Sequence, residues 1–171
     1  MKLFIDSGKP MPWSKVFITG ILVGTLDIGL AFLSAYIQKG TLPEKILQYI
    51  ASGVFGRDAF AVGGGYAIWG LVFHYIIATC FTILIFLFFR YGLFPIKNKW
   101  ITGILAGIAI WAVMQYVVVP LSQVPTPKVK PPVNLVSYLR AAVILIAAIG
   151  LPASLIANQH FNSRHVNTAY K

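Results

Sequence analysis

The chain has few charged residues and very few acidic ones. Of its 171 residues, 11% are Asp, Glu, Lys or Arg, and 4 of these are acids. A soluble domain carries about 25% charged residues, so the composition argues against a soluble globular fold. Because a divalent metal ion takes several oxygen ligands, a chain with so few carboxylates is expected to have no metal site.

Cysteine and the common catalytic motifs are also scarce. The single cysteine, Cys80, cannot form an internal disulfide or a cysteine-based metal site, and we expect it to be a packing residue. The chain has no HExxH zinc motif, no phosphate-binding P-loop and no dinucleotide-binding glycine motif. We therefore expect no cofactor. An enzymatic activity stays open, but the sequence favours a protein that is not an enzyme.

Long apolar runs dominate the sequence. Hydrophobic residues make up 58% of the chain, and its mean hydropathy is +0.79. About 20 apolar residues cross the hydrocarbon core of a bilayer, and four runs reach that length. They cover about residues 13–37, 66–91, 100–121 and 138–157. The sequence therefore predicts an all-α integral membrane protein, a four-helix bundle that forms a single membrane domain over residues 1–171.

A shorter helix is predicted between the first two spans, over about residues 42–55. Thr41 and Glu44 have the spacing of a capping box, which would start this helix. The apolar residues after Glu44 recur on one side, but the segment is too short to span. We expect an interfacial helix that lies on the membrane surface or dips back into the bundle.

The net charge of +10 comes from 14 Lys and Arg residues that lie mainly in loops and tails. Such a distribution is typical of contact with anionic lipid headgroups and of topology control. No basic cluster is interleaved with exposed aromatics, so nucleic-acid binding is not expected. If the N-terminus is inside, more of the basic residues fall on the inner than on the outer side. This excess predicts that both termini are cytoplasmic.

Polar residues inside the spans are the candidate functional residues. A carboxylate near the middle of a span, as at Asp27, costs about 2.5–3.5 kcal/mol on insertion scales, so Asp27 must face protein, water or a cation. At 1.5 Å per residue, Asp27 and His74 lie roughly 15 and 12 Å from the same membrane face. Gln115 and Arg140 lie in the same half of the third and fourth spans. We predict that these four residues surround a polar cavity in one leaflet.

Two interpretations of that cavity stay open. In the first, Asp27 and His74 relay protons or bind a cation or polar headgroup, while Arg140 holds an anionic group at the rim. In the second, the polar side chains satisfy one another and fix the helix register, with Asp27 in its neutral form. The residue types alone do not separate these interpretations.

Small residues on the predicted spans indicate close helix packing. The glycines are Gly20 and Gly24 in the first span, Gly70 in the second, and Gly103 and Gly107 in the third. The heptapeptide ITGILVG at 18–24 nearly recurs as ITGILAG at 101–107. This repeat is explained either by a duplicated helical hairpin or by chance reuse of common membrane residues.

Several short features around the third span form a pattern. They are Phe94-Pro95 and Lys97 before Trp100, then Ala106-Gly107, then Pro120-Leu121, with His74 at the head of the second span. Over about residues 74–127 the chain resembles the YagU-like family of small bacterial inner-membrane proteins. The resemblance implies a location in the bacterial cytoplasmic membrane. Because that family is linked to acid tolerance, it also implies a proton-handling site that includes His74.

The resemblance extends only to His74 and the architecture. At its fourth span the YagU-like family has an acidic residue and a histidine, whereas this chain has Asn134, Tyr138 and Arg140. Asp27 is not part of the family pattern either.

Three functions are compatible with the sequence. The first is a small multi-pass membrane protein that binds or passes a small polar species or protons through the cavity. The second is a structural or accessory subunit that packs against a larger membrane complex. The third is an intramembrane enzyme acting on lipid, with Asp27 and His74 as acid and base. The expected partners are the lipid bilayer and, for the second function, other membrane subunits or further copies of the chain.

Overall fold

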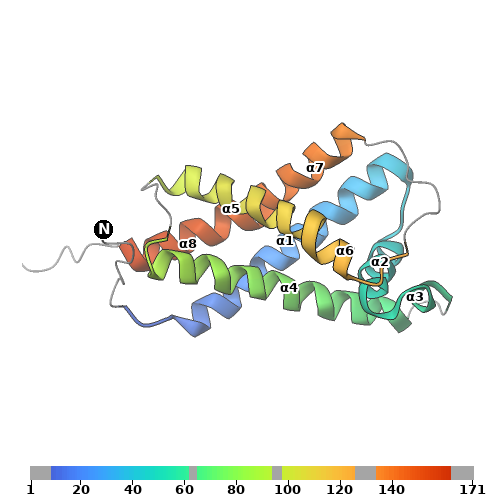
Figure 1. Cartoon of the computed structure of the whole chain (residues 1–171), viewed down its shortest axis with the longest axis horizontal. Coiled ribbons are helices and arrows are strands. Elements are labelled where there is room, and N and C mark those ends of the chain that lie inside the picture. Colours follow the sequence, from blue (N-terminus) through green and yellow to red (C-terminus); the bar gives the residue numbers. More distant parts are fainter. Residues whose placement is uncertain (1–8, 62–64, 94–97, 126–133, 163–171) are drawn as a thin grey trace, which may run out of the picture.

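A computed structural model describes residues 9–61, 65–93, 98–125 and 134–162 (Figure 1). Every regular element in these ranges is helical. The elements are α1 (Trp13–Lys39), α2 (Pro43–Phe55), α3 (Asp58–Ala61), α4 (Gly65–Arg90), α5 (Lys99–Val113), η1 (Met114–Val118), α6 (Val119–Leu121), α7 (Leu135–Leu145), η2 (Ile146–Gly150) and α8 (Leu151–Asn162). The elements η1 and η2 are π-helical turns, each continuous with the α-helices on either side.

Four continuous helical runs in the described residues are long and apolar enough to cross a membrane. They are Trp13–Lys39, Gly65–Arg90, Lys99–Leu121 and Leu135–Asn162. The predicted all-α, four-helix membrane fold with a short helix after the first span is therefore confirmed. Two runs are composite, because η1 interrupts the third and η2 interrupts the fourth.

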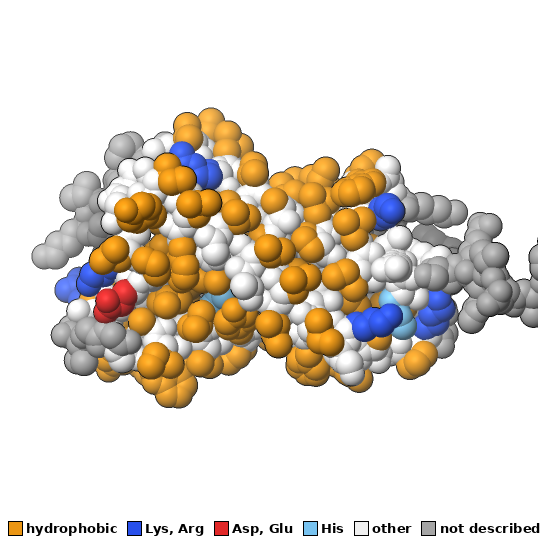
Figure 2. All heavy atoms as spheres, turned by 180° about the vertical axis from the view of Figure 1, so that it is seen from behind, with side chains coloured by type: hydrophobic (Ala, Val, Ile, Leu, Met, Phe, Trp, Pro, Cys, Tyr) orange, Lys and Arg blue, Asp and Glu red, His pale blue; other side chains and the backbone are white. Residues whose placement is uncertain are grey.

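The outer surface is apolar along most of its length, as a lipid-facing surface must be. Hydrophobic side chains cover the middle of the face shown in Figure 2, and basic side chains lie towards its two ends. Large exposed side chains such as Ile18, Ile68 and Leu121 belong to this apolar surface. The distribution fits an integral membrane protein that exposes its charges near the headgroups.

The spans run antiparallel, so four element ends gather at each end of the bundle (Figure 1). The start of α1 and the end of α8 lie at one end. There, Lys9 Nζ donates a hydrogen bond of 2.9 Å to the carbonyl oxygen of His160. At the other end lie α2, α3, α6 and the start of α7. The two ends of the described chain therefore lie on the same side of the membrane.

Both copies of the repeated heptapeptide bring helices into close contact. A Cβ atom on Gly20 would lie 2.8 Å from Thr79 Oγ1 of α4, and one on Gly24 would lie 3.0 Å from Tyr75 Cδ1. In α5, a Cβ on Gly107 would lie 2.5 Å from Ile146 Cα of η2, and Gly103 meets the α8 residue Leu151 in the same way. Each copy thus packs an odd-numbered span onto the span that follows it in sequence.

The short helix α2 packs on the start of α4 at the wide end of the bundle. Its Gln48, Ala51 and Ser52 are buried. The carbonyl oxygen of Leu47 lies against Gly70 of α4, where a Cβ atom would collide with it. On the other side, Gln123 N donates a 2.8 Å hydrogen bond to the Gly53 carbonyl. Of the two placements that the sequence left open, the structure therefore favours a helix held within the bundle.

The start of α2 differs from the prediction. The helix begins at Pro43 with Leu42 as its N-cap, and no side chain caps it, so the predicted capping box of Thr41 and Glu44 is wrong. Proline suits the first helical position, because it has the helical φ and lacks an N–H that would stay unsatisfied there. With the start fixed by Pro43, Glu44 faces along the helix and accepts a long hydrogen bond from Gln48 Nε2 (3.4 Å).

The two π turns occupy equivalent places, each ending two residues before a proline. Pro120 follows η1 and Pro152 follows η2. A proline inside a helix removes one backbone hydrogen bond, and its ring crowds the carbonyl four residues earlier. A π turn lets the helix absorb this crowding without breaking. Pro120, predicted as the start of an extended strap, therefore lies within a helix. Residues 126–133 of that strap lie outside the described residues.

Glycine substitutions should separate the packing contacts from helix propensity. Gly70→Ala should lower the free energy of unfolding by about 1–3 kcal/mol, because the new methyl collides with backbone of α2. Gly29→Ala is the matched control, since nothing lies within 4 Å of a Cβ there. This control should be neutral or stabilising by up to about 1 kcal/mol. Thermal unfolding in detergent measures both, and equal effects would contradict the α2 packing.

Candidate functional site

A cavity of about 350 Å³ lies at the wide half of the bundle, where α1, α2, α4 and the two composite spans converge. Three of the four predicted polar residues, Asp27, His74 and Gln115, line it. Tyr49 of α2 adds a phenol, and the other lining residues are apolar or alanine. The cavity is thus an apolar chamber with a few convergent polar groups, which is the usual composition of a small-ligand site.

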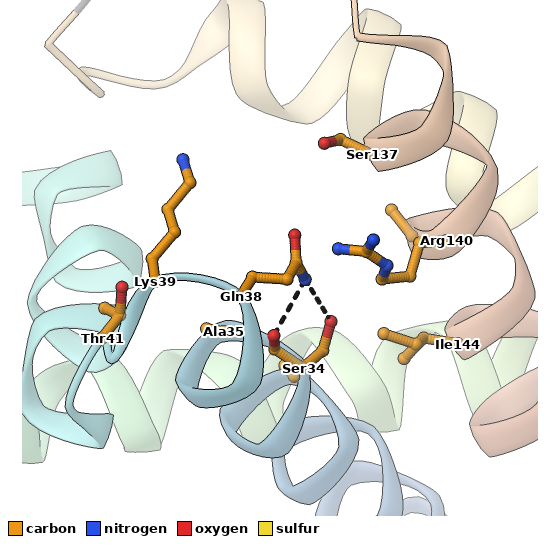
Figure 3. A pocket seen from close by; sticks show the side chains of 10 residues that line it. Ser34, Ala35, Gln38, Lys39, Thr41, Ser137, Arg140 and Ile144 are labelled. Atoms are coloured by element: carbon orange, nitrogen blue, oxygen red, sulfur yellow. Dashed lines mark hydrogen bonds between the residues drawn. The ribbon is translucent and has the colours of Figure 1, made fainter.

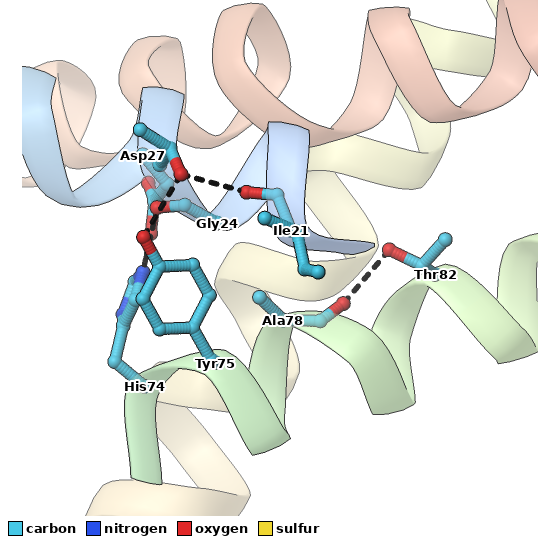
Figure 4. Close-up of polar contacts among 8 residues, drawn as sticks. Ile21, Gly24, Asp27, His74, Tyr75, Ala78 and Thr82 are labelled. Atoms are coloured by element: carbon cyan, nitrogen blue, oxygen red, sulfur yellow. Dashed lines mark hydrogen bonds and ion pairs between the residues drawn. The ribbon is translucent and has the colours of Figure 1, made fainter. Parts of the chain in front are cut away.

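His74 is held at the α1–α4 contact. Its Nε2 lies 2.9 Å from the carbonyl oxygen of Gly24 (Figure 4). Because a carbonyl oxygen only accepts hydrogen bonds, Nε2 carries a proton and donates it. The absence of a side chain on Gly24 brings α4 close enough for this contact. The structure therefore fixes both the tautomer and the ring position of His74.

Asp27 lies one turn further along α1, beside the same imidazole. Its Oδ2 is 4.0 Å from His74 Nε2, which is an ionic contact but too long for a hydrogen bond. The Asp27 side chain is 16% exposed and that of His74 is 11% exposed. No hydrogen-bond donor in the described residues reaches the carboxylate. An ionised carboxylate can accept about four hydrogen bonds, so most of its capacity is unused.

A second pair of side chains fixes the rotation of α4 against α1. Thr25 Oγ1 donates to the Ile21 carbonyl at 2.8 Å, so it accepts the 2.9 Å hydrogen bond from the Tyr75 hydroxyl. The rings of Tyr75 and His74 meet edge to face at 5.7 Å between centroids. The tyrosine thus supports the histidine beside it.

Gln115 and Tyr49 reach the cavity from irregular or short elements. Gln115 lies in η1, and the π turn changes the direction of the side chains that follow α5. Tyr49 lies in α2, and burial raises the pKa of its phenol, so the hydroxyl stays neutral. Both residues can donate and accept hydrogen bonds to a polar guest in the cavity.

Arg140 does not line this cavity. It lines an adjoining pocket between the end of α1 and α7, with Ser34, Gln38 and Ser137 (Figure 3). The two spaces share Ala31, Ala141 and Ile144 as lining residues. The four predicted residues therefore divide into a group of three and an arginine in a neighbouring pocket.

Towards the other end of the bundle, the cavity is closed by the apolar core. Val16, Val23, Ile85 and Phe86 are all at most 3% exposed and belong to one cluster with residues of α5, η2 and α8. The buried Thr82 donates to the carbonyl of its own helix at Ala78. The polar groups of the site thus lie on one side of a packed apolar layer.

The sequence did not predict the contributions of α2, Tyr75 or the π turns. A signal for the π turns was present in Pro120 and Pro152, since a proline in an apolar run must distort the helix before it. The Thr25–Tyr75 hydrogen bond had no such signal, because it depends on the rotation of α4 against α1.

Comparisons of this chain with family models, with curated proteins and with solved structures find no match.

The tautomer of His74 can be tested directly. In ¹⁵N NMR of the ring nitrogens, neutral His74 should carry its proton on Nε2, because that atom donates to the Gly24 carbonyl. The loss of this signal in His74→Gln assigns it. A proton on Nδ1 in the neutral form would contradict the contact.

Proposed function

We propose that this membrane protein binds a small polar or cationic species, with the proton as the first candidate, at Asp27 and His74. The observation that carries the proposal is the arrangement of this pair in the cavity. His74 is oriented by the Gly24 carbonyl, and it faces a carboxylate that has no hydrogen-bond donor of its own in the described structure. A buried acid and a histidine so placed can hold or exchange a proton.

The geometry supports a binding role better than a purely structural one. If Asp27 served only to satisfy His74, the carboxylate should accept the Nε2 proton at hydrogen-bond distance. That proton goes to a backbone carbonyl, and Asp27 stays at 4.0 Å. A buried polar group with unused capacity calls for water, an ion or a ligand.

The cavity lies in one half of the membrane. With both termini in the cytoplasm, as the basic residues predict, its mouth lies on the outer side, and the apolar core separates it from the inner side. Passage across the membrane would require this core to open. The proposal also fits the proton-handling role implied by the resemblance to YagU-like bacterial inner-membrane proteins.

The accessory-subunit alternative relied on small-residue faces that would meet partner helices. In the structure Gly20, Gly24, Gly70, Gly103 and Gly107 all contact helices of the same chain. A partner subunit would therefore have to use another surface, and no observation in the structure favours that function.

Asp27→Asn tests the proposal. The variant should be as stable as the wild type or more stable, because Asn keeps the shape without a carboxylate to bury. The carboxyl signal of a protonated Asp27, followed by infrared difference spectroscopy across pH, should disappear in the variant. Asp58→Asn, an exposed acid in α3, is the matched control and should keep the full signal.

Proton flux into liposomes containing the protein shows whether binding extends to passage. A flux above that of protein-free liposomes should fall at least about tenfold in Asp27→Asn and in His74→Gln, but not in Asp58→Asn. The binding proposal would be abandoned if Asp27→Asn lost several kcal/mol of stability while its pH-dependent spectrum stayed unchanged.

A further inference from the structure

The pocket that holds Arg140 has a different chemistry from the Asp27–His74 cavity. It has a volume of about 370 Å³ and lies between the last turns of α1 and the start of α7. Two of its lining residues, Lys39 and Arg140, are cationic, and four more, Ser34, Gln38, Thr41 and Ser137, are polar. None of the described residues that line it is acidic. The pocket is therefore a positively charged, donor-rich space.

Arg140 is the central group of this pocket. Its guanidinium points into the gap between α7 and α1, towards Gln38 (Figure 3). Its Nη1 is buried but has no hydrogen-bond partner among the described residues. A buried, unpartnered nitrogen of a charged group is costly, because hydrogen bonds to water have been lost without replacement. A bound anion at this position would remove that cost.

The polar neighbours are arranged to donate. Gln38 Nε2 donates to both the carbonyl oxygen (2.8 Å) and the hydroxyl (2.7 Å) of Ser34. The Ser34 hydroxyl accepts in this contact, so its own proton remains to be donated. Ser137 offers a second hydroxyl from α7. A guanidinium fork with hydroxyl donors and a nearby lysine is a typical site for a phosphate group.

The depth of the pocket matches the headgroup region. Arg140 lies about five residues into the helix that begins at Leu135, roughly 7.5 Å along its axis. Lys39 is the last residue of α1. The polar headgroup layer is about 5–8 Å thick on each side of the hydrocarbon core. Basic pockets between spans at this depth can hold anionic lipid headgroups.

From these observations we infer that the Arg140 pocket is a binding site for a phosphate-bearing anion, such as the phosphate of an anionic phospholipid. Arg140 binds the phosphate oxygens through its forked N–H groups, and Ser34 and Ser137 donate further hydrogen bonds. Lys39 adds positive charge at the rim. The site is independent of the proposed proton or cation binding at Asp27 and His74, although the two spaces share part of their walls.

The test measures the melting temperature of the purified full-length protein in neutral detergent as a function of added lipid. Phosphatidylglycerol should raise the melting temperature in a concentration-dependent way, because it binds the folded state. Diacylglycerol with the same acyl chains lacks the phosphate and should have no such effect. Inorganic phosphate, compared with chloride at equal ionic strength, distinguishes the sources. Stabilisation by phosphatidylglycerol alone assigns a lipid headgroup, and stabilisation by both assigns a site that also takes free phosphate.

Variants assign the effect to the pocket. Arg140→Gln should weaken the apparent affinity for phosphatidylglycerol about tenfold or more, since it removes hydrogen bonds to a charged group. Arg57→Gln removes the same charge from an exposed arginine near the same end of the bundle and should change the affinity less than about twofold. Arg140→Lys keeps the charge without the fork and should fall between these values.

Ser137→Ala keeps the test decisive if Arg140→Gln fails to fold, because it removes one donor from an otherwise intact pocket and should weaken binding measurably. The inference is overturned if diacylglycerol stabilises as well as phosphatidylglycerol. It is also overturned if the Arg140 and Arg57 variants lose affinity equally, which would show a general effect of net charge.

Discussion

The contact between the His74 imidazole and the Gly24 carbonyl is the interaction on which the arrangement of the site depends. It requires α1 and α4 to approach closely, which small residues at the interface permit. It also directs the only Nε2 proton of neutral His74 to backbone, which leaves Asp27 beside the ring but not bonded to it. A bulkier residue at position 24 would separate the helices and change the surroundings of both side chains.

The bundle has two halves of different character. In the half that holds the termini, apolar side chains such as Val16 and Phe86 pack without leaving a polar space. In the other half, α2 is inserted beside α4, and the composite spans bend around it at their π turns. The bundle widens there, and this widening creates room for both the Asp27–His74 cavity and the Arg140 pocket. Close packing in one half thus supports an open, polar interior in the other.

Much of the fold could be predicted from the sequence, because hydrophobic length and polar placement are local properties. The four spans, the short helix and the shared depth of Asp27, His74 and Gln115 follow from residue counts along each run. The separation of Arg140 could not be predicted, since depth alone does not say which side of a helix faces which neighbour. The start of α2 was wrong by one residue, because Pro43 outweighed the capping pattern of Thr41 and Glu44.

The π turns also have a consequence for how this chain tolerates insertions and deletions. A π turn contains one more residue than an α-helical path of equal length would need, and each residue rotates an α-helix by about 100°. Removal of a single residue within Met114–Val118 would restore a regular helix and rotate all that follows relative to α5. The segment that meets α2 at Gly53 would then face another direction. The third span therefore carries its length as positional information, so that a one-residue deletion there would change the shape of the cavity more than many substitutions in its wall.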